Sequence, residues 1–560
     1  MVAAGLLLAV ACRPCHAETY QSYQQTGMGR SVSAVAPASI AGGSFFNAAS
    51  DRHYAILRRG GAWFVRRHQA GFERAIDNVV EKQVHYVIGS GNHARSYVHR
   101  SGQGRLLELP VSWYPAEKRW AMSPGYDRPS HPDFRREISA ECLFCHAASP
   151  ERIEPIDCQR CHGPGEAHAR APARANIVNP ARLDARRQLE ICLQCHLETT
   201  SRTLPHAIRR YDRPLFSYRP GERLEDYVLH FDHAAGRGYD DKFEINHAGY
   251  RLMKSRCFER SGASMTCTTC HDPHRVPRAA EAARRYNGAC RTCHAAAIAG
   301  HASQPNCVSC HMPKRRAEDA MHMVMTDHFI QRRPVEPARR PFESESDYRG
   351  PVEPYYPPRP ADRLYAAVAQ VKDFSNLEAG IPMLEKAIAE AQPPQAEFYF
   401  DLAEAYWRTG RADRAMELYE EVIRRQPGFA RAWHNLGEVL LRRGEAQRAI
   451  AVLENAPRDA EIWNTLGVAY GQTGRLQDSA RLLSRAVEAN PDLPSAWLNL
   501  GVAREQSGDA VAAEAAFRAA IRLQPDLVYA HQYLANLLRV IGRAEEAEYH
   551  ARRAAHAGQR

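Results

Sequence analysis

No cysteine occurs in residues 311–560, so all fifteen cysteines of the 560-residue chain lie before them. Long apolar runs are also missing: after the N-terminus, no segment offers the roughly eighteen consecutive apolar residues of a membrane-spanning helix. The chain is nevertheless too long for one ordinary hydrophobic core. The uneven cysteine distribution therefore predicts two modules with different chemistry, neither of which spans a membrane.

A strong charge of one sign is missing as well. Lys and Arg number 74 against 64 Asp and Glu, which gives a formal net charge of +10 at pH 7. Local basic pairs such as Arg315 and Arg316 are typical of a solvated face rather than of a nucleic-acid site. We therefore expect no nucleic-acid partner.

Fourteen of the fifteen cysteines belong to one short motif, which we number one to seven in chain order. Two cysteines stand three positions apart and a histidine follows the second, which is the attachment signature of c-type haem. Two thioethers hold the porphyrin, and the histidine binds the iron from the proximal side. Chance predicts about 0.02 such motifs in this composition, so the pattern predicts seven covalently attached haem c groups. The attaching cysteines are Cys12, Cys15, Cys142, Cys145, Cys158, Cys161, Cys192, Cys195, Cys267, Cys270, Cys290, Cys293, Cys307 and Cys310, and the proximal histidines are His16, His146, His162, His196, His271, His294 and His311.

Zinc is the alternative reading of paired C-x-x-C elements. Cys142, Cys145, Cys158 and Cys161 have a workable spacing for one tetrahedral zinc site. Zinc has no use for a histidine after every second cysteine, whereas all seven motifs have one. The pattern therefore favours haem.

Cys257, in the phrase SRCFERSG, is the one cysteine outside the motifs, and it has no partner left for an intrachain disulfide. We interpret it as a small buried side chain. The alternative is a redox-active or sulfur-ligating thiol.

The first half predicts a haem-cored domain with a small β-rich insert. Residues 1–11, MVAAGLLLAVA, resemble the end of a secretory signal, although no positive segment precedes them. Residues 12–330 contain every motif, and the haems must supply much of their core because apolar runs are few. At about 50–130, short β-branched runs separated by glycines predict strands. The Pro- and Arg-rich residues 331–361 predict a linker.

The second half shows a different repeat. WHNLGEVL, WNTLGVAY and WLNLGVAR begin at Trp433, Trp463 and Trp497, and glycines and prolines follow them at intervals that are mostly 34 residues. This spacing is typical of the tetratricopeptide repeat, an antiparallel helix pair. We expect a solenoid over 362–560, with five clear repeats from Gln395 and a degenerate one before it. The interval from Gly444 to Pro457 is four residues shorter than the equivalent one, which predicts a second helix about one turn short. The predicted fold class is mainly α.

The sixth iron ligand decides whether a haem only transfers electrons or also binds a substrate. Fifteen further histidines in residues 1–330 could supply it, which exceeds the seven irons. They are His53, His68, His85, His93, His99, His131, His168, His206, His230, His233, His247, His274, His301, His322 and His328.

Four phrases carry a family resemblance: CQRCHGPGEAH at 158–168, SMTCTTCHDPH at 264–274, CHMPK at 310–314 and MTDHFIQRRP at 325–334. With them the chain resembles the multihaem c-type cytochromes related to the tetrahaem electron carrier of hydroxylamine oxidoreductase, in the branch with C-terminal tetratricopeptide repeats. The resemblance implies that distal histidines come from neighbouring haem segments. Those that it implies are His93, His168, His274, His322 and His328.

Met28 marks a departure from that family pattern. Other members often carry a histidine twelve residues after the first proximal histidine, where this chain has Met28. A methionine would raise the potential of the haem that it ligates. The alternative is ordinary packing, which leaves one iron open.

Together these observations predict an exported electron-transfer protein, periplasmic or otherwise extracytoplasmic, because bacteria attach haem c outside the cytoplasm. The repeats would dock a redox partner protein in their groove. The alternative is a multihaem oxidoreductase that acts on a small nitrogen or sulfur oxyanion at one five-coordinate haem. Nitrite-reducing pentahaem enzymes replace one proximal histidine by lysine, and no motif here does so.

Overall fold

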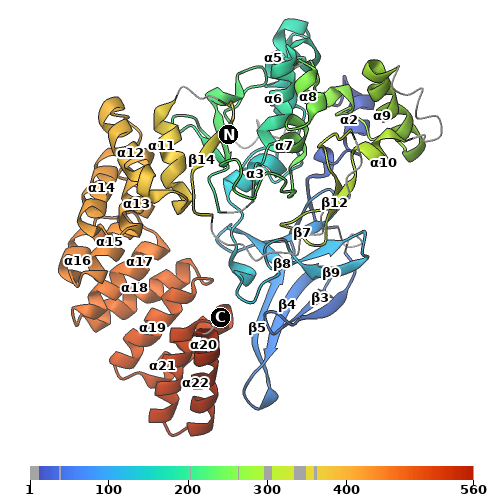
Figure 1. The fold of residues 1–560 in the computed structure, drawn as a ribbon. Helices are drawn as coiled ribbons and strands as arrows, with labels where there is room; N and C mark the ends of the chain where they lie inside the picture. The colour runs from blue at the N-terminus through green and yellow to red at the C-terminus, as the bar shows by residue number, and fades with distance from the viewer. Residues whose placement is uncertain are drawn as a thin grey trace.

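The computed structural model describes residues 12–36, 40–201, 203–262, 264–295, 306–332, 348–358 and 362–558. The expected signal remnant, residues 1–11, lies outside them. Figure 1 shows a β-rich part, a part in which short helices are joined by long loops, and a curved stack of longer helices. Among the described stretches, none of the helices combines the length and hydropathy needed to cross a bilayer.

The β-rich part consists of two antiparallel sheets. One has four strands in chain order, β2 (Gly43–Asn47), β3 (Arg52–Arg59), β4 (Ala62–Ala70) and β5 (Ile76–Gln83). The other has the order β1 (Val32–Ala34), β6 (Tyr86–Ile88), β7 (Arg95–Arg100), β8 (Leu106–Tyr114) and β9 (Arg119–Met122). Alternating residues of β4 are buried, including Val65, which packs in one core with Leu109 and Val111 of β8. The expected β-rich region is present, and its strands begin earlier than residue 50.

The motifs lie on or beside short helices. The helices of this part are α2 (Ala17–Tyr23), α3 (Ala140–His146), α4 (Gln159–His162), α5 (Glu166–Arg170), α6 (Ala185–His196), α7 (Ala248–Met253), α8 (Arg256–Arg260), α9 (Ala279–His294) and α10 (Cys307–His311). Five of them, α3, α4, α6, α9 and α10, end at a proximal histidine. Side-chain caps fix where some of them begin: the Asp184 carboxylate accepts the Arg187 N–H at α6, and the Asn306 amide oxygen accepts the Val308 N–H at α10.

One strand of a small three-stranded sheet comes from the segment that was expected to be a linker. β14 (Val352–Tyr356) pairs antiparallel with β11 (Val228–His233), which also pairs with β10 (Ala207–Arg209). The linker expectation therefore differs from the structure at residues 348–358, while 333–347 and 359–361 lie outside the described residues. Pro354 made this segment look unlike a strand, but β14 is an edge strand, where proline is tolerated. The remaining strands, β12 (Lys314–Arg316) and β13 (Val324–Thr326), form a hairpin.

Six helix pairs form the solenoid. They are α11 (Arg363–Val371) with α12 (Leu377–Ala391), α13 (Ala396–Arg408) with α14 (Ala412–Arg425), α15 (Ala430–Arg442) with α16 (Ala446–Leu453), α17 (Ala460–Gln472) with α18 (Leu476–Ala489), α19 (Pro494–Gln506) with α20 (Ala510–Leu523), and α21 (Val528–Val540) with α22 (Ala544–Gly558). The repeated glycines Gly410, Gly444, Gly474, Gly508 and Gly542 have φ between 77° and 82°. This left-handed turn is accessible to glycine without steric cost, which explains its recurrence. α16 has 8 residues where α14, α18 and α20 have 14, so the shortened second helix is confirmed.

Both ends of the solenoid are attached to the rest of the chain. At its start, Arg210 pairs with Asp362 at 2.8 Å, and Phe231 of β11 shares a core with Val368 of α11. At its far end, α20 packs against β5, as Figure 1 shows.

Charged contacts join the far end to the sheets. Asp492, between α18 and α19, lies 2.7 Å from Lys82 and 3.6 Å from Arg105. The buried guanidinium of Arg67 donates to the carbonyl of Arg522 at 2.8 Å. The solenoid and the sheets therefore close into one body.

Replacing Asp492 by asparagine removes the carboxylate shared by Lys82 and Arg105. Because these groups are mostly buried, we expect the far end of the solenoid to loosen from the sheets by about 1–2 kcal/mol. Faster amide exchange in β5 and α20, measured by hydrogen–deuterium exchange, would show this. Asp478→Asn is the control, since that carboxylate pairs with exposed Arg475 and Arg481. Equal protection of β5 in both variants would contradict the prediction.

Two buried histidines make the last repeat sensitive to acid. His531 takes the place of the repeated tryptophan and, like Trp433 and Trp497, donates to a proline carbonyl, leaving its Nδ1 to meet Nδ1 of His550 at 2.9 Å. Burial lowers the pKa of His531 to about 4 and that of His550 to about 3. The unfolded chain therefore takes up these protons first, so stability falls as the pH drops below about 6.5.

We expect His531 alone to lower the stability of the last repeat by about 2 kcal/mol at pH 5 relative to pH 7. Amide exchange of α21 and α22 at the two pH values measures it. His550→Leu should reduce the loss because one titrating ring is gone, whereas His556→Leu, at an exposed position of α22, should not. The same acid sensitivity in all three proteins would sink this interpretation.

Candidate haem-binding cavity

One cavity of about 3280 Å³ runs through the part of the fold that carries the motifs. All fourteen motif cysteines and all seven proximal histidines line it. Divided among seven motifs, this volume is about 470 Å³ for each, within the range of about 300–1,000 Å³ typical of cofactor sites. Seven separate motifs therefore converge on a shared space with room for bulky groups.

Thiol contacts connect the motifs in space. Close contacts join the thiols of Cys12 and Cys158, Cys145 and Cys195, Cys192 and Cys267, and Cys290 and Cys307. The first of these lowers the pKa of Cys12 to about 7 and raises that of Cys158. Electrostatic contacts of Cys161 with Cys192 and of Cys270 with Cys290 complete the connections. Motif four thus neighbours motifs two, three and five, and all seven motifs form one connected group.

Three proximal histidines face a second histidine across the cavity. The ring centres are 6.3 Å apart for His16 and His168, 5.8 Å for His162 and His274, and 6.2 Å for His271 and His328. An iron between two imidazoles, with metal–nitrogen bonds of about 2.0–2.1 Å, places the ring centres about 6.3 Å apart. The planes of the paired rings differ by 17°, 22° and 35°, and the spacing of their centres fits an iron between them.

Hydrogen bonds select the nitrogen that faces the cavity. The Nδ1 atom of His162 lies 2.9 Å from the carbonyl of Val178, and those of His168 and His328 each lie 3.1 Å from a backbone carbonyl. A carbonyl can only accept, so Nδ1 carries the proton and Nε2 is left bare as a metal ligand. Burial also lowers the pKa of His162 and His328, which favours the neutral ring that a metal requires.

The other predicted distal ligands are placed differently. Met28 and His93 line the cavity, so both have access to it. His322 is not among the described residues that line it. Its Nδ1 lies 3.3 Å from Glu117, and its ring packs against Tyr114 of β8. The structure therefore gives His322 a partner in the β-rich part instead of a place beside a motif.

Six of the fifteen further histidines line the described part of the cavity, and two of these, His206 and His247, were not singled out in the sequence. His301 lies outside the described residues. The backbone N–H of Glu244 donates to Nδ1 of His247 at 3.1 Å. The proton of a neutral His247 ring is therefore on Nε2, and this tautomer is unsuited to binding iron through Nε2.

Cys257 also lines the cavity. It is only partly buried, and it interacts electrostatically with Cys270 and Cys293 of motifs five and six. Burial raises the pKa of its thiol, so the thiol stays protonated at neutral pH. We expected a small buried side chain, and the structure differs in that Cys257 is only partly buried.

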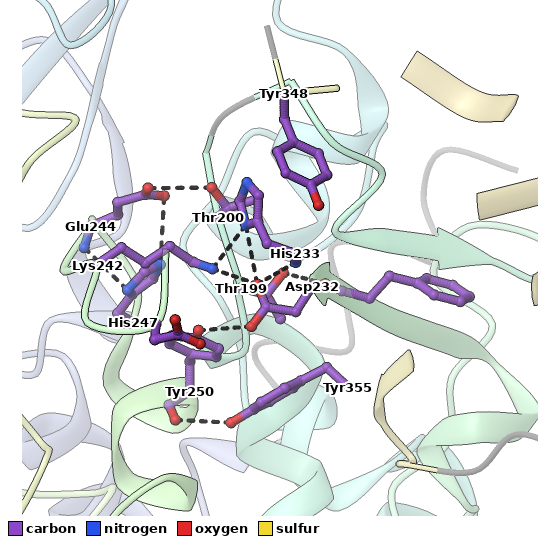
Figure 2. Close-up of polar contacts among 12 residues, drawn as sticks. Thr199, Thr200, Asp232, His233, Lys242, Glu244, His247, Tyr250, Tyr348 and Tyr355 are labelled. Carbon is purple, nitrogen blue, oxygen red and sulfur yellow. Dashed lines mark hydrogen bonds and ion pairs between the residues drawn. The ribbon is translucent and has the colours of Figure 1, made fainter. Parts of the chain in front are cut away.

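A buried charge network joins β11 to the segment that leads into α7 (Figure 2). The ammonium of Lys242, 1% exposed, contacts Asp232 and lies 3.0 Å from Nδ1 of His233, and the Tyr250 hydroxyl donates to Asp232 at 2.7 Å. Burial opposes the ionisation of Asp232, but bonds from His233, Lys242 and Tyr250 lower its pKa to about 2. The Asp232 carboxylate is therefore ionised at neutral pH.

This network supports the segment that holds motif four in place. The Asn246 amide donates to the carbonyl of Cys195 at 2.5 Å. Gly249 passes so close that a Cβ there would lie 2.5 Å from the carbonyl of His196. Residues 242–250 thus position motif four, a role that no sequence motif signalled.

Two family models match parts of the chain. A model described as a doubled CXXCH motif matches residues 261–299, which hold motifs five and six. A tetratricopeptide repeat model matches residues 373–428, 400–461 and 464–528. No curated protein matches the chain.

Solved structures of repeat proteins are similar to part of the chain. One titled "Crystal structure of MamA" is 22% identical, with 28% of this chain and 95% of that chain covered and a TM-score of 0.26. A MamA fragment from Desulfovibrio magneticus RS-1 is 22% identical, covering 27% of this chain and 87% of that chain, with a TM-score of 0.25. YrrB, titled a TPR protein with an unusual peptide-binding site, is 20% identical, covering 31% and 91%, with a TM-score of 0.26.

The repeats are thus confirmed as tetratricopeptide repeats, and the doubled motif points to covalent haem c. Together they indicate a c-type cytochrome that carries a tetratricopeptide solenoid.

Proposed function

We propose that this chain is an exported seven-haem c-type cytochrome that passes electrons along its haem groups, while its repeats dock a redox partner protein. The observation that carries the proposal is the single cavity lined by all 21 motif residues. Zinc sites would need compact groups of ligands instead. Among the described residues, no three or more His, Cys, Asp or Glu side chains form such a group.

The motifs are neighbours in space, which supports electron transfer from haem to haem. The thiol contacts and electrostatic interactions lead from motif one through three, four, five and six to seven, and motif two joins at motif four. Haems attached at these cysteines would therefore be neighbours, as electron exchange between them requires. From this order we infer a row of haems with one side branch.

The facing histidines support the same function. Two axial histidines saturate an iron and leave it able only to exchange electrons. His168, His274 and His328 are the distal ligands that we propose for the haems of motifs one, three and five, because each faces the proximal histidine of that motif. Met28 and His93 remain candidates for others.

A docking role for the repeats is supported by exposed apolar side chains. Tyr529 and Tyr533 of α21 are one helical turn apart, and both are exposed. Val511 of α20, Val540 at the end of α21 and the following Ile541 are exposed as well. Tetratricopeptide stacks present an extended concave surface to their partners. The partner that we propose is a redox protein. Export is supported by residues 1–11 and by the compartment in which bacteria attach haem c.

Haem counting tests the proposal directly. The intact mass of the purified mature protein should exceed its polypeptide mass by seven haems, and electron paramagnetic resonance should show low-spin ferric signals. A colourless protein with only its polypeptide mass would contradict the proposal. A native high-spin haem that binds nitrite or hydroxylamine would favour the oxidoreductase alternative.

His274→Ala tests the facing pairs. Loss of the proposed distal ligand of the motif-three haem should convert one haem in seven to a high-spin spectrum, without loss of haem mass. His322→Ala is the matched control because His322 contacts Glu117 and Tyr114 in the β-rich part. Unchanged low-spin spectra in His274→Ala would remove His274 from the ligand set.

A further inference from the structure

Arg160 lies where three motifs meet. It belongs to motif three, between Cys158 and Cys161, and its guanidinium donates to the carbonyls of Ala147 and Ala148 at 3.3 and 3.5 Å. These two residues directly follow the proximal histidine of motif two. The carbonyl of Arg160 in turn accepts the side-chain amide of Gln194, in motif four, at 3.3 Å.

Two aromatic rings hold the guanidinium in place. It lies 4.6 Å from the centre of the Phe144 ring, within motif two, and 4.6 Å from that of Phe216. The rings of Phe144 and Phe216 contact each other edge to face. Such cation–π contacts favour a charged group that has lost part of its water.

No carboxylate of the described residues forms an ion pair with Arg160 (the nearby Asp157 pairs with Arg152 at 3.5 Å). The side chain instead lies near Cys145, Cys161 and Cys195, one attachment cysteine from each of the three motifs. Arg160 therefore brings a positive charge without a carboxylate partner among the described residues to the place where motifs two, three and four meet.

We propose that Arg160 sets the reduction potentials at the junction of the electron pathway, as a positioning residue that also supplies a fixed charge to the haems of motifs two, three and four. This inference rests on the proposed electron-transfer function. Reduction removes one positive charge from a haem iron, so a neighbouring cation favours the reduced form. Electrons would accordingly collect on the haems of motifs two, three and four, around the point where the side branch joins the row.

Replacing Arg160 by methionine tests the inference, because methionine keeps a long side chain between the two rings and removes the charge. Potentiometric titration followed by haem absorbance should show a subset of haems shifted about tenfold toward the oxidised form, which is about 59 mV for a one-electron couple. Arg160→Lys keeps the charge but loses the guanidinium hydrogen bonds to the carbonyls of Ala147 and Ala148. Its reduction potentials should be close to those of the wild type. Arg448→Met, an exposed arginine of the solenoid, controls for the loss of one charge.

The outcomes are distinct. Unchanged potentials in Arg160→Met, with seven haems attached and electron transfer intact, would overturn the inference and leave the proposed function standing. Equal shifts in the methionine and lysine variants would show that only the geometry matters. A wild-type protein without haem would instead overturn the proposed function.

If Arg160→Met fails to mature with its haems, Arg160→Gln and Arg160→Lys make the same comparison. Both variants lose the guanidinium group, and only the lysine variant retains the positive charge. A potential in the glutamine variant lower than in the lysine variant supports the inference, and equal potentials reject it.

Discussion

The convergence of all seven motifs on one cavity is the constraint on which the cytochrome half depends. Short helices that end at their histidines, long loops and few apolar runs would be a poor way to build an independent core. In the function that we propose, the haems attached at these motifs would supply the missing apolar surface. The buried network of Asp232, Lys242 and Tyr250 then serves the cavity from outside, because it fixes the segment that bears on motif four.

The strongly patterned features could be predicted from the sequence. The tetratricopeptide helices, the turn glycines and the short α16 follow from spacing alone, because each repeat obeys the same local geometry. The β-rich part followed from alternation. β14 did not, since a proline-containing edge strand is defined by the partner that it meets, and that partner lies more than a hundred residues away.

The ligand set shows the same limit. The proximal histidines are local to their motifs, whereas a facing histidine depends on tertiary structure and on which atom its Nδ1 meets. His168 and His247 both line the cavity, yet one meets a carbonyl and the other an amide N–H, which leaves opposite protonation at Nε2. His322 was singled out with His168, but it lies against Tyr114. Arg160 carried no signal because its contacts with motifs two and four depend on how α3, α4 and α6 pack together.

The solenoid is attached to the rest of the fold at both of its ends, so its superhelical pitch cannot change without affecting those attachments. The first repeat shares its core with β11, and the later repeats contact the sheets through the Asp492–Lys82 ion pair and the hydrogen bond from Arg67. β5 contacts β7, whose Ser96 and Val98 form part of the cavity wall. A molecule that bends the repeats would therefore also displace the two sheets, and with them the part of the cavity wall that β7 forms.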